Sequence, residues 1–111
     1  PGLEAVSEAI QAVLAAEDDL DSDEACECLA ACEVIARLQG RWGLRNSYSE
    51  ELDKWVEENP IVVPDALKEA AEAAIERILA PNSELPELWD DGGRNETWHD
   101  AINDLRHRIK G

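Results

Sequence analysis

The segment PDALKEAAEAAIERIL, residues 64–79, predicts one amphipathic α-helix. Its apolar side chains recur at intervals of three and four residues, which aligns them along one face of a helix. Pro64 suits the first helical turn, where its missing N–H removes no hydrogen bond, and Pro81 ends the helix. The apolar stripe consists of Leu67, Ala70, Ala71, Ala74, Ile75, Ile78 and Leu79.

On both sides of this segment, apolar residues at intervals of three and four predict further helices. No segment alternates apolar and polar residues as a half-buried strand requires, and the strand-like pair Val62 and Val63 lies between two prolines. The sequence therefore predicts an all-α fold, a compact bundle of five or six helices that forms a single domain over residues 1–111. We expect helices over residues 3–17, 22–40, 47–58, 64–79, 83–89 and 95–109.

Several predicted helices begin with residues whose side chains can cap a helix. Asp21 followed by Glu24 has the spacing of a capping box for the second helix, and Ser47 opens the third in the same way. Ser83 and Asn95 precede the last two helices. At such a position a side-chain oxygen accepts a hydrogen bond from a free backbone N–H, so we expect all four residues to act as caps.

The chain carries a large negative charge. Among its 111 residues, 26 acids outweigh 10 bases, which gives a formal net charge of −16 at pH 7. The segment EDDLDSDE, residues 17–24, contains six of these acids and no base. Such a surface repels the phosphates of nucleic acids and anionic lipids, and it attracts basic proteins or cations. We expect a basic protein as partner, with no direct binding to nucleic acid or membrane, although an acidic face can also serve solubility alone.

The ends and the apolar content of the chain bear on its location. No apolar run is long enough to cross a bilayer, and the first residues lack the basic and apolar regions of a signal peptide. We therefore predict a cytoplasmic protein. Because the chain starts with Pro1 and Gly2 and contains no Met, we also expect a processed or truncated product that lacks an amino-terminal segment.

All three cysteines lie in the segment ACECLAACEVIA, residues 25–36. On a helix, Cys28 and Cys32 project to the same apolar side, whereas Cys26 projects to the polar side with Glu33 and Arg37. The three thiols do not converge, and a zinc site usually needs four ligands in paired spacings. Helical geometry is also poor for a disulfide between neighbouring turns. We predict that Cys28 and Cys32 are small buried residues that allow close helix packing, and that Cys26 is exposed.

The acidic segment also resembles the beginning of an EF-hand loop. Asp19, Asp21 and Asp23 have the required spacing. The sixth loop position, however, is Glu24 rather than Gly, and the twelfth is Ala30 rather than a bidentate Glu. The segment therefore favours a loosely held cation over a specific calcium site.

No catalytic or metal-binding motif stands out elsewhere. His99 and His107 share the last predicted helix but stand about 12 Å apart along its axis, too far to bind one metal ion, and we expect both on the surface. No Ser, Thr or Cys lies in a recognisable nucleophile motif, and carboxylate pairs are too frequent to single one out. The sequence thus predicts no catalytic residue, no metal ligand and no cofactor.

The four tryptophans fall into two pairs. Trp89 and Trp98 lie on the apolar stripes of the last two helices, and we expect both to join these helices to the core. Trp42 and Trp55 flank the most irregular connection in the sequence. Either of them would be an anchor for a partner if it were exposed.

Three stretches of the chain, residues 25–41, 59–93 and 98–109, resemble a bacterial family catalogued as domain of unknown function 4259. The resemblance implies a helical fold, and it assigns no activity and no catalytic residue. Relatives tend to have Ala where Cys28 and Cys32 stand, and the amino-terminal Gly-Trp-Gly and Asn-Asp segment typical of the family is absent here. The shared positions are Gly40, Ser83, Glu84, Leu85, Leu88, Trp89, Trp98, Leu105 and Arg108.

We therefore expect a non-enzymatic, acidic protein-binding module, of the kind that acts as an immunity protein or inhibitor by neutralising a basic partner. Two alternatives stay open. A metal- or thiol-dependent enzyme would purify with stoichiometric metal or show a fast-reacting Cys26, and a structural subunit would have a mass above that of the monomer. The predicted partner-binding residues are Asp18, Asp19, Asp21, Asp23, Glu24, Trp42 and Trp55.

Overall fold

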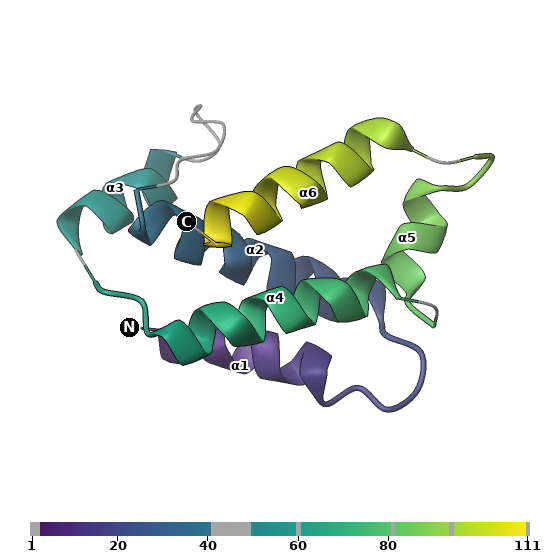
Figure 1. Ribbon diagram of the computed structural model, residues 1–111, viewed down its shortest axis with the longest axis horizontal. Helices are drawn as coiled ribbons and strands as arrows, with labels where there is room; N and C mark the ends of the chain where they lie inside the picture. Colours follow the sequence, from purple (N-terminus) through teal and green to yellow (C-terminus); the bar gives the residue numbers. More distant parts are fainter. Residues whose placement is uncertain (1–2, 41–49, 60, 81, 94, 111) are drawn as a thin grey trace.

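Six α-helices form the secondary structure of the residues that the computed structural model describes, which are 3–40, 50–59, 61–80, 82–93 and 95–110 (Figure 1). Within these ranges, the sole β-pairing is an isolated parallel bridge between Leu20 and Ser83. The prediction of an all-α bundle is confirmed. The helices are α1 (Glu4–Leu14), α2 (Ser22–Leu38), α3 (Glu50–Glu58), α4 (Asp65–Leu79), α5 (Glu84–Trp89) and α6 (Glu96–Lys110).

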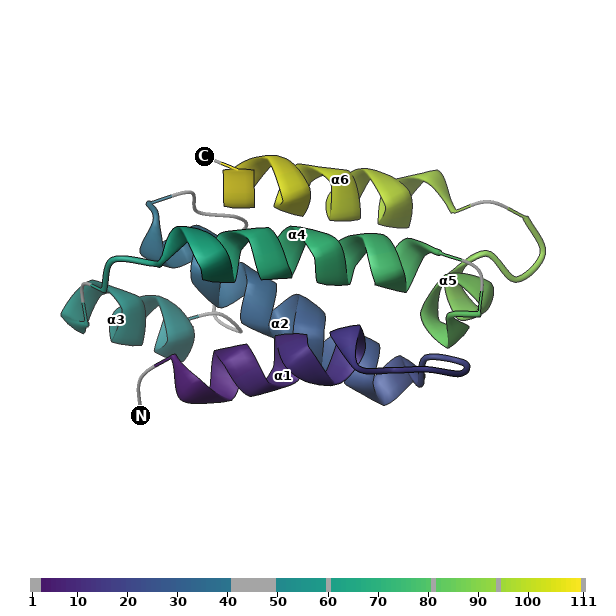
Figure 2. The ribbon, with the colours of Figure 1, turned by 60° about the horizontal axis from the view of Figure 1, so that its bottom comes forward.

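The central helix of the bundle is α2, which contacts each of the other five helices. It packs beside α4, and α1 and α6 each contact both members of this pair, from opposite sides (Figure 2). The two short helices lie at opposite ends of the molecule, α3 at one end and α5 at the other (Figure 1). The loop between α1 and α2 lies at the same end as α5.

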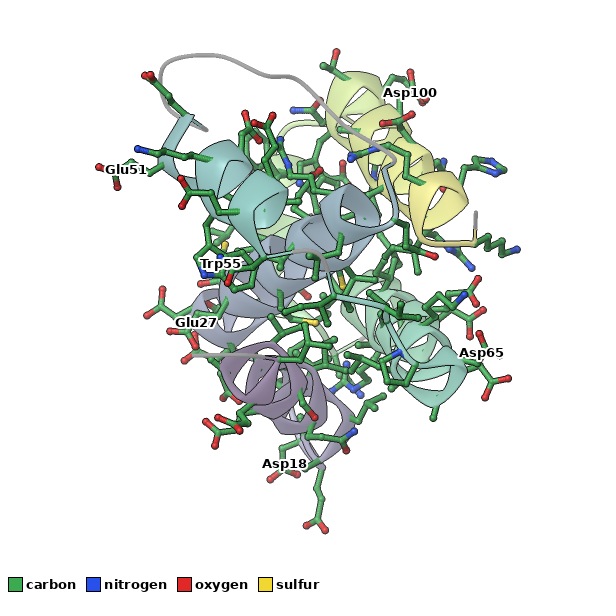
Figure 3. All side chains as sticks on the ribbon, turned by 90° about the vertical axis from the view of Figure 1, so that its left-hand side faces the viewer. Asp18, Glu27, Glu51, Trp55, Asp65 and Asp100 are labelled. Carbon is green, nitrogen blue, oxygen red and sulfur yellow. The ribbon has the colours of Figure 1, made fainter. Side chains whose placement is uncertain are left out.

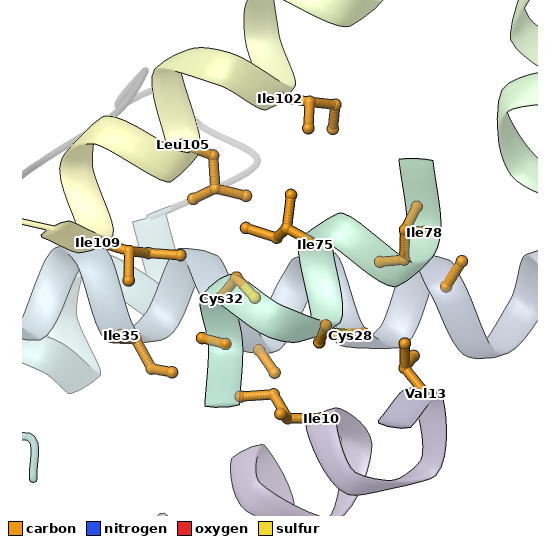
Figure 4. Close-up of a cluster of buried hydrophobic side chains, with 14 of the residues drawn as sticks. Ile10, Val13, Cys28, Cys32, Ile35, Ile75, Ile78, Ile102, Leu105 and Ile109 are labelled. Carbon is orange, nitrogen blue, oxygen red and sulfur yellow. The ribbon is translucent and has the colours of Figure 1, made fainter. Parts of the chain in front are cut away.

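Small side chains on α2 allow these close contacts. Cys28 and Cys32 are fully buried, next to apolar residues of α1 and α4 such as Ile10 and Ile75 (Figure 4). Cys26 is exposed. A helix that touches five others needs small residues where backbones approach, because larger ones would hold the helices apart. The predicted packing role of the two buried cysteines is confirmed. The other small buried residues of α2 are Ala25, Ala31 and Ala36.

The first helix ends three residues earlier than predicted. Its last residue is Leu14, whose side chain is 38% exposed, so the expected end at Glu17 is wrong. The chain leaves the helix there and turns so that Leu20 inserts into the core with no exposed surface. Burial of the Leu20 side chain stabilises the fold more than a further turn of exposed, acidic helix would.

Two of the predicted caps are confirmed. Asp21 Oδ1 accepts a hydrogen bond from the backbone N–H of Asp23 (3.1 Å), and Asn95 Oδ1 accepts one from that of Trp98 (3.0 Å). Ser83 stands at the cap position of α5 but makes no side-chain capping bond, so that prediction is wrong. Ser47 lies outside the described residues.

A buried ion pair attaches α3 to α2, and a partly buried one attaches α6 to α2. Arg37 is 6% exposed, and its guanidinium donates hydrogen bonds to Asp53 of α3 and to Glu33 on its own helix. Glu33 also accepts two hydrogen bonds from Arg108 of α6, at 2.5 and 3.0 Å. Burial alone would raise the pKa of the Glu33 carboxyl, but the hydrogen bonds and charges of the two arginines outweigh burial and lower this pKa.

Candidate functional site

Two acidic segments that are far apart in the sequence meet at one end of the bundle. They are residues 17–24, which lead from the α1–α2 loop into α2, and residues 84–91, which contain α5 (Figures 1 and 2). The backbone N–H of Leu20 donates to the carbonyl of Asn82 (2.8 Å), and the N–H of Glu84 donates to the carbonyl of Leu20 (2.9 Å). This short parallel bridge fixes the position of one acidic segment relative to the other.

Arg77 of α4 strengthens this junction. Its guanidinium donates to the backbone carbonyls of Asp18 (2.6 Å) and Asn82 (3.2 Å), one on each side of the bridge. Asn82 adopts a positive φ of 64°, a conformation that Asn tolerates better than most residues because its short side chain can bond locally. Arg77 therefore binds the backbone of the two loops. Among the described residues, it makes no ion pair with a carboxylate of either acidic segment.

We call the two segments together the acidic end. Segment 17–24 supplies six carboxylates and segment 84–91 supplies four, and neither contains Lys or Arg. All of these residues are exposed except Asp90, which is half-buried. The acidic residues are Glu17, Asp18, Asp19, Asp21, Asp23, Glu24, Glu84, Glu87, Asp90 and Asp91.

A smaller share of the carboxylates belongs to ion pairs at the acidic end than in the rest of the bundle. On the other helices, Glu76 pairs with Arg106 (3.2 Å) and Asp65 with Lys68 (3.1 Å), although acids such as Glu8 and Glu69 also make no ion pair with a described residue. At the acidic end, Asp90 bonds His99, and the other nine carboxylates make no ion pair with any described residue. Unpaired like charges held close together raise the negative potential at this end.

Five of the predicted partner-binding residues lie together at the acidic end. Each is exposed, although the Asp21 side chain also caps α2. Their exposed carboxylates are Asp18, Asp19, Asp21, Asp23 and Glu24.

The predicted tryptophan anchors do not lie in the same patch. Trp55 belongs to α3, at the opposite end of the bundle, and its side chain is half-buried (Figure 1). Figure 3 views that end and shows Trp55 beside α3, well separated from Asp18 at the lower edge. Trp42 lies outside the described residues. Asp18 and Trp55 therefore do not belong to a single continuous surface.

A groove and a smaller hollow adjoin the acidic end. The groove measures about 580 Å³, and its walls combine Leu79, Ala80 and Pro86 with acids that include Glu87 and Asp91. The hollow measures about 80 Å³ and is lined by Asp19, Ser83, Glu84 and Glu87. Ser83 borders both and is 3% exposed, and its hydroxyl has no hydrogen-bond partner among the residues that the structure describes.

Sequence reasoning missed the exposed apolar surface of α5. Trp89 was expected in the core, yet 48% of its surface is exposed, and Leu88 beside it is 60% exposed. Trp89 does join the last two helices, because its ring stacks on that of Trp98 with centroids 6.1 Å apart. Trp98 is buried as predicted. The helix is only six residues long, so one turn of contact with the core leaves its outer side open.

The prediction that both histidines lie on the surface is half right. His107 is exposed, but the His99 side chain is 13% exposed, and its Nε2 lies 2.9 Å from Asp90 Oδ2. Asp90 Oδ1 also accepts a hydrogen bond from the backbone N–H of Asn95 (2.8 Å). These bonds hold the α5–α6 connection in place, which accounts for the burial of His99.

The described part of the chain contains no metal-binding cluster. No group of three or more His, Cys, Asp or Glu side chains there is placed to hold a metal ion, even at the acidic end. The exposed carboxylates can still attract cations without a fixed coordination geometry.

The family of the chain follows from comparison with known proteins. Residues 2–101 match the family model named Domain of unknown function (DUF4259). The chain belongs to this family. No curated protein and no solved structure shows a significant match. Among the described helices of this DUF4259 member, none has the length and apolar character to cross a lipid bilayer.

Proposed function

We propose that this DUF4259 protein is a non-enzymatic binding module whose acidic end binds a basic protein, as an immunity protein or inhibitor does when it neutralises its target. One observation carries the proposal. The Leu20–Ser83 bridge holds two acidic segments side by side, and apart from Asp90 their carboxylates have no ion-pair partner among the described residues.

Such an arrangement has a free-energy cost that a partner can remove. Carboxylates held close together repel one another, and a basic surface that docks on them replaces repulsion with attraction. The same field speeds the encounter of oppositely charged proteins and disfavours phosphate-bearing partners. Recognition of this kind weakens as the ionic strength rises, because salt screens exposed charges.

A cytoplasmic location accompanies the proposal. The three cysteines are free thiols, and free thiols are typical of proteins kept in a reducing compartment.

The two alternative functions have separate tests. An enzyme is tested by its metal content after purification, and an oligomeric subunit is tested by its mass in solution.

The test uses capture of proteins from a cell lysate on immobilised protein, at low salt and at roughly 0.5 M salt, where the Debye length falls to a few ångströms. Capture by the natural chain is compared with capture by two variants of equal charge. The acidic-end variant carries Asp18→Asn, Asp19→Asn, Glu84→Gln and Glu87→Gln. The control variant neutralises four exposed acids elsewhere, Glu8→Gln, Glu51→Gln, Glu69→Gln and Asp100→Asn.

We expect the natural chain and the control variant to retain one basic protein at low salt and to release it at high salt. The acidic-end variant should retain it weakly or not at all. If both variants lose capture to the same extent, net charge rather than the acidic end governs binding. If neither salt nor substitution changes what is retained, the proposal is wrong.

A further inference from the structure

Helix α5 combines exposed apolar and acidic side chains. Among the described residues, four large apolar side chains are exposed, and two of these, Leu88 and Trp89, are adjacent on α5. The other two, Leu14 and Val62, lie singly on separate elements. Single exposed apolar residues are ordinary, whereas two consecutive ones among carboxylates offer apolar surface that a partner can cover.

The geometry of α5 places these side chains next to carboxylates. Leu85 is 4% exposed and anchors the helix on the core. Because successive residues are about 100° apart, Leu88 lies roughly 60° to one side of Leu85 and Trp89 roughly 40° to the other. Glu84 is one helical turn before Leu88, on the same face. Glu87 lies beyond Leu88, on the side facing away from the core.

Trp89 has a defined orientation although it is half exposed. Its ring stacks on Trp98, with an interplanar angle of 12°, and Trp98 is buried on α6. An aromatic side chain that is already fixed loses little conformational entropy when a partner covers it. Such rigid aromatic residues are favoured as anchors in protein interfaces, and the open part of an indole also attracts Lys and Arg.

We propose that α5 is the docking site for a basic amphipathic segment of the partner, which places apolar side chains on Leu88 and on Trp89, at the two flanks of the helix, and its Lys or Arg residues on the surrounding carboxylates. The inference rests on the proposed function and specifies the chemistry of the partner. Charge complementarity identifies the occupant, since residues 84–91 contain four acids and no base. The groove of about 580 Å³ beside Pro86 and Glu87 gives room for a long basic side chain.

The test uses two synthetic peptides of equal charge as probes. One contains Lys with Leu at every third or fourth position, so that it forms an amphipathic helix, and the other replaces each Leu with Ser. Binding is measured at low salt by titration, and NMR follows the indole N–H of Trp89 and the amides of α5. The variant Leu88→Ser is compared with Val62→Ser, which removes an apolar side chain that is 92% exposed on a different loop.

We expect the Leu peptide to bind the natural chain roughly fivefold more tightly than the Ser peptide, because Leu88 and Trp89 lose further apolar surface to it. It should shift the Trp89 resonance. Leu88→Ser should reduce the affinity for the Leu peptide to that for the Ser peptide, and Val62→Ser should leave both unchanged.

Other outcomes separate the two proposals. If both peptides bind equally well, or if Leu88→Ser has no effect, α5 is not the docking site although the acidic end still binds bases. Shifts of the α3 or α4 amides instead of α5 would lead to the same conclusion. If neither peptide binds at low salt, both the docking site and the proposed function are wrong.

Discussion

The backbone carbonyl of Leu20 accepts a hydrogen bond from the N–H of Glu84 at 2.9 Å, and this bond joins the two acidic segments of the protein. Leu20 itself is fully buried while the acids around it are exposed. One apolar side chain thus draws a highly charged loop onto the bundle. The conformation of the acidic end depends on this burial more than on any attraction between its charges, because those charges are all negative.

Replacement of Leu20 tests this dependence. We expect Leu20→Ala to lower the free energy of unfolding by about 3 kcal/mol, because it removes buried surface and leaves a cavity. It should also speed amide hydrogen exchange at Glu84. Leu14→Ala is the matched control, since Leu14 is 38% exposed, and its cost should stay below about 1 kcal/mol. Denaturant unfolding gives both values, and equal costs would contradict the anchoring role of Leu20.

The attachment of α3 depends on a buried ion pair. Asp53 is 5% exposed, and Arg37, its partner on α2, is 6% exposed. Asp53→Asn removes a negative charge next to the buried Arg37 guanidinium, whose positive charge is then only partly neutralised. We therefore expect the free energy of unfolding to fall by about 3 kcal/mol. Glu51→Gln, an exposed change on the same helix, should cost almost nothing. A similar small cost for both substitutions would show that α3 is held by apolar contacts alone.

Glu33 gives the protein a defined response to acid. Its pKa is lower in the folded chain than its ordinary value of 4.5, because the bonds to Arg108 and Arg37 outweigh burial. The unfolded chain therefore takes up this proton first as the pH falls. The stabilisation by the Glu33 carboxylate is complete above about pH 4.5 and is lost as the pH drops through the folded pKa.

Glu33→Gln isolates this contribution from that of the other acids. At pH 7 we expect the variant to be less stable than the natural chain by about 2 kcal/mol, and the difference should shrink below pH 4.5. Thermal or denaturant unfolding across the pH range measures the difference directly. Glu27→Gln, an exposed substitution on the same helix, should change the free energy of unfolding little at pH 7. A constant difference between the natural chain and Glu33→Gln would contradict the pKa shift.

The thiols should differ sharply in reactivity. Cys26 is exposed, whereas Cys28 and Cys32 are buried, and the hydrogen bond with Cys28 together with burial raises the pKa of the Cys32 thiol. A thiol-specific reagent such as DTNB should therefore label one cysteine of the native protein and all three after denaturation. Cys26→Ser should abolish native labelling. A second thiol that reacts at a similar rate would show that α2 opens readily.

Periodicity was sufficient to predict the helices, because apolar stripes at intervals of three and four determine which faces are buried whatever the topology. It also placed Cys28 and Cys32 in the core. The junction of the two acidic segments was not predictable, since it depends on Leu20 meeting Ser83, a contact between residues far apart in the chain. The exposure of Trp89 was missed for a related reason: residue type favours burial, but a short helix at the end of the bundle has too few neighbours to cover it.

The two predicted caps of the last helices show how local rules fail at a tertiary contact. Asn95 caps α6 as expected, through its bond to the N–H of Trp98. Ser83 has the same position relative to α5, but it lies in the bridge with Leu20, whose hydrogen bonds are made by the neighbouring Asn82 and Glu84. Its hydroxyl is buried and has no hydrogen-bond partner among the described residues. A buried hydroxyl that makes no hydrogen bond destabilises a protein, because it has lost its bonds to water.

Alanine should therefore destabilise the protein at position 95 but not at position 83. We expect Asn95→Ala to lower the free energy of unfolding by about 1 kcal/mol, the usual value for a lost cap. Ser83→Ala removes only the unpartnered hydroxyl, so we expect it to leave stability unchanged or to raise it by up to about 1 kcal/mol. Denaturant unfolding of both variants at neutral pH measures the two changes under the same conditions. If Ser83→Ala costs as much as Asn95→Ala, the hydroxyl has a bonding partner in solution, and the short helix α5 is capped after all.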